Sequence, residues 1–120
     1  MFVGDYWIMT EKTAFLKKIG DNARNRVLEF FIEGRGLDYA KQDVAEETKV
    51  SRQTIYKIIE EFIENDFIVF SRKAGKTNLY KLNEKSRIVK SFIDIFEAAI
   101  REEINKATNN KTLKPITQHA

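Results

Sequence analysis

The segment at residues 43–68, DVAEETKVSRQTIYKIIEEFIENDFI, constrains the fold of this 120-residue chain more than any other. It predicts two short helices joined by a tight turn at Lys49-Val50. The first helix is expected over residues 41–48, with Val44 and Ala45 packing inward. The second is expected to begin at Ser51, whose hydroxyl suits an N-cap, and to run to about residue 65.

The second helix has two chemically different sides. Its apolar residues fall within roughly 140° of one another at 100° per residue and are expected to be core: Ile55, Ile58, Ile59, Phe62 and Ile63. The opposite side carries Gln53, Thr54, Lys57, Glu60, Glu61 and Glu64. Only the first turns of that side are neutral or basic, so only they could enter a groove lined by phosphates, and the three glutamates should point away.

Strands and further helices are expected around this pair. Residues 67–72 and 78–82 read as two strands joined by a turn at 74–77, with Leu79 and Tyr80 on the two faces of the returning strand. Upstream, Thr10 is expected to cap a short helix that stops at Gly20. A stronger helix should follow, capped by Asp21 and ending at residues 34–36, with a short extended link at 37–39. The buried side of that helix is expected to comprise Val27, Leu28, Phe30, Phe31 and Ile32.

A long terminal helix is expected from a cap at Asn83 or Ser86 to about Ala107. Its apolar residues spread over about half its circumference, a wider stripe than one small domain normally buries. A two-fold dimer is the economical explanation, with residues 2–15 helping to cover the helix; burial within its own domain is the alternative. The expected dimerisation residues are Ile88, Phe92, Ile95, Phe96, Ala99 and Ile100.

The expected organisation has four parts: an N-terminal segment with a short helix (1–20), a central domain (21–83), the terminal helix (84–107) and a flexible tail (108–120). The chain is mildly basic, with a net charge of +3. Between residues 71 and 90, however, seven Lys or Arg face a single Glu, a local net charge of +6. A cluster of that sign suits phosphate, although a solvated face is the plain alternative.

The central domain resembles the winged helix-turn-helix of prokaryotic transcription regulators, the group that includes the MarR and ArsR types. The resemblance is carried by Asp43-Val44-Ala45, Val50-Ser51-Arg52, Thr54-Ile55-Tyr56, the stretch 62–68 leading into the hairpin and the stretch 75–82 closing it. It implies a mainly α fold with a small β-hairpin wing and a long C-terminal dimerisation helix. It also implies a homodimeric, sequence-specific regulator that binds double-stranded DNA at an inverted repeat, with the second helix in the major groove.

The expected DNA-binding residues follow from that resemblance and from residue type. Gln53 can pair with adenine, and Arg52 can reach guanine or, preferably, a phosphate. Ser51 and Thr54 can donate hydrogen bonds to phosphate. Tyr56 lies partly toward the core by its angle on the helix, but its hydroxyl could reach a phosphate at the rim of the groove. Lys57 and the wing cations would add affinity that depends on salt but not on sequence. The full expected set is Ser51, Arg52, Gln53, Thr54, Tyr56, Lys57, Arg72, Lys73 and Lys76.

Several classes of function are disfavoured by composition. The chain has no Cys and a single His, His119, so no metal site is expected, and metal sensing of the ArsR kind is disfavoured. No glycine-rich phosphate loop or nucleophile–base pair appears, so neither an enzyme nor a cofactor is expected. No segment reads as a membrane span or secretory signal, which favours a cytoplasmic protein.

Two alternative functions remain open from the sequence. One is a winged-helix protein-interaction module that never touches DNA, because fold alone does not decide function. The other is a repressor with an apolar effector pocket between the terminal helix and the DNA-binding core, for which the Phe-rich composition gives no specific support. The sequence does not indicate an effector, a target operator or whether transcription is repressed or activated.

Overall fold

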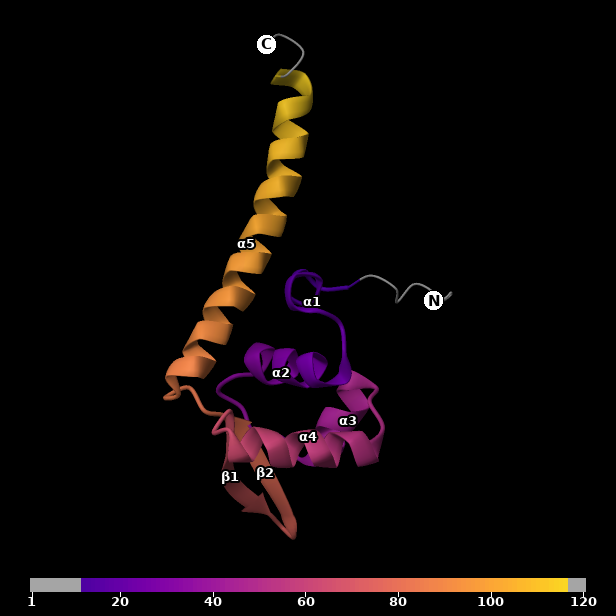
Figure 1. Ribbon diagram of the computed structural model, residues 1–120, viewed down its shortest axis with the longest axis vertical. Coiled ribbons are helices and arrows are strands. Elements are labelled where there is room, and N and C mark those ends of the chain that lie inside the picture. The colour runs from indigo at the N-terminus through magenta and orange to yellow at the C-terminus, as the bar shows by residue number, and fades with distance from the viewer. Residues whose placement is uncertain (1–11, 117–120) are drawn as a thin grey trace.

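The mainly α architecture with one small hairpin is confirmed by the computed structural model, which describes residues 12–116 and the side chains of residues 12–109. Helices α2, α3 and α4 form a compact group, the hairpin extends beyond α4, and α5 leaves the group on the opposite side (Figure 1). In chain order the elements are α1 (Ala14–Ile19), α2 (Ala23–Glu33), α3 (Lys41–Thr48), α4 (Arg52–Glu64), β1 (Ile68–Ala74), β2 (Thr77–Leu82) and α5 (Arg87–Ile116).

The two N-terminal helices begin later than the sequence predicted. Thr13, not Thr10, caps α1, because its hydroxyl accepts a hydrogen bond from the Leu16 amide at 3.2 Å; Thr10 lies outside the described residues. Asn22, not Asp21, caps α2 through its side-chain oxygen, which accepts from the Asn25 amide at 2.8 Å. An amide oxygen serves this role as well as a carboxylate does, and it leaves Asp21 free for an ion pair.

The turn between α3 and α4 lies where the sequence placed it. Lys49 adopts a left-handed conformation with φ of 60°, and its amide donates to the Ala45 carbonyl at 2.9 Å, which ends α3. Ser51 then caps α4 by accepting from the Thr54 amide at 3.3 Å. Val44 is fully buried beneath this turn. The turn therefore holds the two helices against one core and presents the start of α4 to solvent.

The core lies between α1, α2, α4, the base of the hairpin and the first half of α5. Edge-to-face ring contacts connect these elements: Phe15 to Phe96 at 5.7 Å, and Phe67 to both Phe62 at 5.4 Å and Phe92 at 5.6 Å. Such pairs add to the area that each ring buries. The fully buried side chains are Phe15, Val27, Leu28, Phe31, Ile32, Val44, Ile55, Ile59, Phe62, Ile68 and Val89.

Two expected core positions differ from the structure. Ile63 is 39% exposed, because it lies at the edge of the α4 stripe and beyond the reach of the other elements. Phe30 is only half-buried, with its ring 4.6 Å from the Tyr39 ring. Leu79 and Tyr80, expected on the two faces of the returning strand, are both buried.

The hairpin is longer and its turn tighter than predicted. β1 continues to Ala74, two residues beyond the expected end, and pairs antiparallel with β2 across the two-residue turn Gly75-Lys76. Gly75 has φ of 65°, which glycine adopts without cost. The register shifts between Phe70 and Arg72, where a bulge leaves Ser71 without a partner across the sheet. At the base, Tyr39 and Tyr80 exchange two main-chain hydrogen bonds of 2.8 Å, so the α2–α3 connection pairs with the wing.

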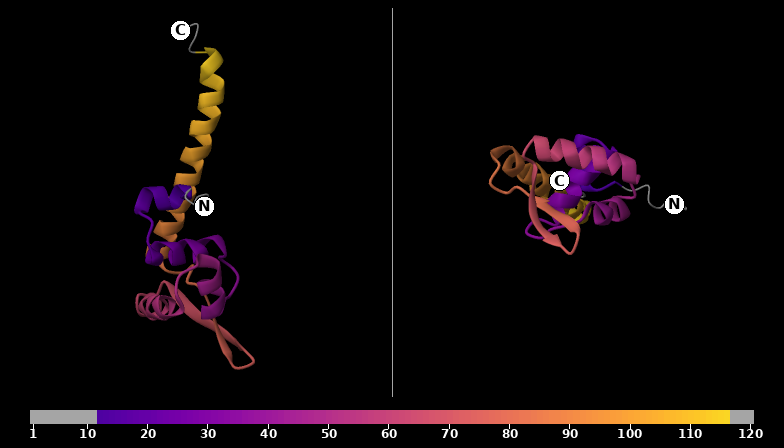
Figure 2. Two further views of the ribbon diagram at one scale, coloured as in Figure 1. Left: turned by 90° about the vertical axis from the view of Figure 1, so that its right-hand side faces the viewer. Right: turned by 90° about the horizontal axis from the view of Figure 1, so that it is seen from below.

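Helix α5 is longer than the sequence suggested. Ser86 is the cap among the two alternatives, since its hydroxyl accepts from the Val89 amide at 3.2 Å. The predicted end at Ala107 is wrong: the helix continues to Ile116. Asn and Thr each cost less than about 1 kcal/mol in a helix, and no glycine interrupts the polar residues that follow Ala107. Their polar composition alone is therefore not enough to end the helix. The last turns of α5 extend well away from the other elements (Figure 2). No described helix is long and apolar enough to cross a bilayer.

Candidate nucleic-acid interface

The first two turns of α4 form an exposed polar surface. Gln53, Tyr56 and Lys57 are all exposed, and their spacing of three and four residues puts them in one row on the helix. Ser51 and Arg52 are exposed beside this row, and Thr54 is half-buried with its hydroxyl accepting from that of Ser51 at 2.9 Å. The residues expected at the start of the second helix therefore lie together at the surface, on the side of the molecule away from the end of α5 (Figure 1).

Lys41 belongs to this surface, and sequence analysis missed it. Its ammonium lies 4.8 Å from the centroid of the Tyr56 ring, a cation–π geometry. The contact joins the start of α3 to the second turn of α4 and holds the Tyr56 ring, which is 45% exposed. Because the two residues are on different helices, no spacing in the sequence reveals the pair. Tyr56 is thus a surface residue rather than part of the core.

The charge of α4 changes sign along its length. Beyond Lys57 the exposed side carries Glu60 and Glu64, while Glu61 accepts a hydrogen bond from Arg24 at 2.6 Å. Arg24 also lies over the Phe62 and Phe67 rings, which ties α2 to the second half of α4. Carboxylates repel phosphate, so a nucleic acid could contact only the first half of the helix.

The wing carries its cations in two different settings. Lys73 in β1 and Lys76 in the turn are exposed, and neither forms an ion pair with any residue that the structure describes. Arg72, by contrast, is paired: its Nε donates to Oδ2 of Asp38 at 2.9 Å, and its Nη2 donates to Oδ1 at 3.4 Å. The three cations that the sequence grouped together therefore divide into two unpaired lysines near the tip and one paired arginine nearer the base.

Asp38 is the second residue that sequence analysis missed. It lies in the α2–α3 connection next to Tyr39, and it also accepts from the Ser71 hydroxyl at 2.8 Å. The hydrogen bonds from Arg72 and Ser71 hold the pKa of Asp38 below its usual value, so the carboxylate is charged at neutral pH. A lone aspartate in a loop, far from the wing in sequence, gives no signal of this role.

The predicted dimerisation residues occupy two environments on α5. Phe96 and Ala99 are buried and Phe92 is half-buried, because α1 and the hairpin base of the same chain cover them. These three side chains therefore pack mainly within their own chain. Ile88, Ile95 and Ile100 are exposed, as is Ile104. Ion pairs from Lys17 to Glu103 and from Lys18 to Glu102 fasten α1 along the same helix.

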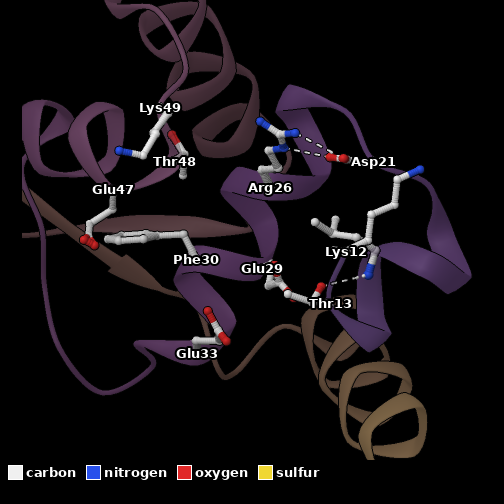
Figure 3. Close-up of a pocket in the computed structure, with 11 residues that line it drawn as sticks. Lys12, Thr13, Asp21, Arg26, Glu29, Phe30, Glu33, Glu47, Thr48 and Lys49 are labelled. Atoms are coloured by element: carbon white, nitrogen blue, oxygen red, sulfur yellow. Dashed lines mark hydrogen bonds and ion pairs between the residues drawn. The ribbon is translucent and has the colours of Figure 1, made fainter. Parts of the chain in front are cut away.

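A hollow of about 530 Å³ lies between the start of α1, α2 and the end of α3 (Figure 3). Glu29 lies at its base, only 7% exposed, and its Oε2 has no hydrogen-bond donor among the described residues. Burial, followed by the nearby charges of Glu33 and Asp21, raises the pKa of Glu29 above its usual value, although a hydrogen bond from Thr13 partly offsets the rise. Asp21 itself is paired with Arg26 at 2.7 Å. Among the side chains of residues 12–109, no cluster of three metal-ligating groups occurs.

Comparison with solved structures places this arrangement in a known fold, although no family model and no curated protein matches the sequence. A MepR–DNA complex from Staphylococcus aureus aligns with a TM-score of 0.58 and 11% identity, over 88% of this chain and 85% of MepR. The type III plasmid segregation protein TubR aligns with a TM-score of 0.54 and 24% identity, over 73% of this chain and 88% of TubR. Reduced HlyU from Vibrio cholerae aligns with a TM-score of 0.52 and 16% identity, over 71% and 83%. The chain has the winged helix-turn-helix fold of these proteins, as its sequence predicted.

Proposed function

We propose that this protein is a DNA-binding transcription regulator that inserts the start of α4 into the major groove and lays its wing on the DNA backbone. One observation carries the proposal: the exposed cations of the first turns of α4 and of the wing tip have no ion-pair partners in the part of the chain that is described. Unpaired cations around a neutral polar row suit a phosphate-lined groove. The solved complex of MepR with DNA shows that a protein of this fold binds DNA.

Within this proposal, side-chain chemistry divides the contacts into two kinds. Gln53 lies in the exposed row and has the amide needed to pair with adenine. Ser51, Thr54, Arg52 and Lys57 flank it and would contact phosphates, as would Lys73 and Lys76 from the wing. Tyr56, held by Lys41, would donate its hydroxyl at the rim of the groove. Gln53 would therefore carry specificity, while the cations would carry affinity.

A homodimer is the second part of the proposal. Ile88, Ile95, Ile100 and Ile104 remain exposed on α5, and the helix continues beyond Ala99 without cover from α2, α3 or α4. Exposed apolar side chains repeated along a helix favour pairing with a second copy, and the usual arrangement is two-fold. A two-fold dimer would bind two half-sites in inverted orientation, about one helical turn (roughly 34–36 Å) apart.

Selection of bound fragments from a random double-stranded DNA pool tests both parts of the proposal. Wild-type protein should enrich an inverted repeat, and Gln53→Ala should lose the preference for adenine at one position in each half-site while keeping most of its affinity. Glu64→Gln, on the acidic half of α4, is the matched control and should enrich the wild-type sequence. If no fragment is enriched and none is retained at low salt, the proposal fails and a protein-docking role replaces it.

A further inference from the structure

The base of the wing is fastened to the α2–α3 connection through one carboxylate. Neighbouring residues in a strand normally point to opposite faces, so Ser71 and Arg72 should not reach the same group. The bulge between Phe70 and Arg72 removes that constraint, because an extra residue in one strand re-aims the side chains beside it. As a result, the Ser71 hydroxyl and the Arg72 guanidinium both donate to Asp38.

The contact uses only part of the arginine. A guanidinium has five N–H groups, and Asp38 accepts from the Nε–H and from one N–H of Nη2. The side chain of Arg72 is 63% exposed, whereas that of Asp38 is only 18% exposed. The carboxylate is therefore tucked against the protein, while the outer edge of the guanidinium faces solvent with three N–H groups that Asp38 does not use.

A second contact makes this anchor rigid. Immediately after Asp38, the main chain of Tyr39 exchanges two hydrogen bonds of 2.8 Å with Tyr80 on the neighbouring strand of the wing. The α2–α3 connection thus holds both strands of the hairpin, one by its main chain and the other by the Asp38 side chain. Lys73 and Lys76, which lie farther toward the tip, have no comparable support among the described residues.

We propose that Asp38 is a positioning residue that presets Arg72, through the Ser71 bulge, to donate the free edge of its guanidinium to a DNA phosphate. The inference rests on the proposed DNA-binding function and adds a residue that does not touch DNA itself. Two fixed donors at one edge suit the geometry of a phosphate, and a held arginine loses less conformational freedom on binding than a mobile lysine does. Arg72 then binds a phosphate with fixed geometry, whereas Lys73 and Lys76 attract the DNA backbone through their charge alone.

The test is DNA binding by the full chain, measured with a random double-stranded fragment between about 50 and 200 mM salt. The variants are Asp38→Asn, Arg72→Ala and the two combined. Asp66→Asn is the matched control, because it removes the same charge from an exposed residue near the wing base whose left-handed conformation asparagine accepts. Each phosphate contact contributes about 0.9 to the slope of log affinity against log salt, or about 3.5-fold over this range.

Asp38→Asn and Arg72→Ala are each expected to bind more weakly than wild type at low salt and to lose about 0.9 from the salt slope. In the Arg72→Ala background, Asp38→Asn should have no further effect on the slope. If Asp38 only stabilised the fold, Asp38→Asn would lower thermal stability but would keep the wild-type slope of log affinity against log salt. The inference is overturned if Asp38→Asn binds more tightly than Asp66→Asn, since Asp38 would then compete with phosphate rather than orient Arg72.

Arg72→Lys gives a second test if Asp38→Asn does not fold. Lysine keeps the charge and can reach Asp38, but it lacks a second edge for phosphate, so its salt slope should also fall by about 0.9. Binding by Arg72→Lys with the wild-type slope would overturn the inference. If wild-type protein does not bind at any salt concentration, the proposed function itself has failed; if wild type binds and Asp38→Asn behaves like Asp66→Asn, only the inference has failed.

Discussion

Replacement of Glu29 by glutamine should stabilise the protein at neutral pH. Glu29 is buried at the base of the hollow between α1 and α2, and its Oε2 has no donor among the described residues. Glutamine keeps the shape of the side chain and the oxygen that accepts from Thr13, but it removes a charge that burial disfavours. Glu29 therefore lowers the stability of the folded state whenever it is ionised.

The size and sign of the effect follow from the same geometry. Burying an ionised carboxylate whose oxygen lacks a donor costs at least about 1–3 kcal/mol. The neutral amide removes the charge part of that cost, so the free energy of unfolding should rise by up to about that amount at neutral pH. For a domain of this size, the midpoint of thermal unfolding should rise by about 4 °C for each kcal/mol. The raised pKa means that the folded state holds the Glu29 proton more tightly than the unfolded state does. The penalty is therefore absent below the ordinary pKa of 4.5 and grows as pH rises through the raised value.

Thermal unfolding from about pH 4 to pH 8 measures this prediction. Glu29→Gln should exceed wild type at the neutral end, and the difference should shrink toward the acidic end. Glu64→Gln, an exposed carboxylate on α4, is the matched control and should follow wild type throughout. A Glu29→Gln variant that is less stable than wild type at neutral pH would refute the reasoning, because it would show that the ionised carboxylate has a stabilising partner.

Three further predictions concern packing and assembly. Gly34→Ala should lower thermal stability, because its new Cβ would lie only 2.8 Å from Cζ of Tyr39 and would push that ring from its place beside Phe30; equal midpoints in a thermal scan would contradict this. Lys49→Gly should raise the free energy of unfolding by up to about 1 kcal/mol in a denaturant titration, because glycine adopts φ of 60° without strain. Ile95→Asp should shift the molar mass measured by light scattering from dimer to monomer, whereas Asp94→Asn, the adjacent exposed position, should leave the mass unchanged.

The order of elements could be predicted because local pattern decides it. The apolar stripe of α4 and the cap at Ser51 are properties of neighbouring residues. The structure confirms the cap, and it buries every predicted residue of the stripe except Ile63. The start of α2 could not be predicted because adjacent residues compete for the same role. Asp21 and Asn22 can each cap a helix, and only the ion pair between Asp21 and Arg26 decides between them.

The parts of the candidate site that sequence analysis missed depend on contacts between distant residues. Asp38 meets Arg72 only because the α2–α3 connection pairs with the wing, and Lys41 meets Tyr56 only because α3 packs against α4. The difference in burial between apolar residues of α5 also depends on contacts between distant parts of the chain. The sequence shows that Phe96 and Ile95 are both apolar, but the position of α1 buries the first and leaves the second exposed.

The most direct test of the central claim is the salt dependence of binding to double-stranded DNA for wild type and for Lys73→Ala/Lys76→Ala. Lys17→Ala/Lys18→Ala removes the same charge from α1, beside α5 and away from the wing, and is the matched control. The account predicts that wild-type affinity falls steeply with salt and that the wing variant loses up to about 1.8 from the slope, or 0.9 for each lysine, while the control keeps it. Equal slopes for the two double variants would contradict binding through the wing, and no binding at low salt would contradict the proposed function.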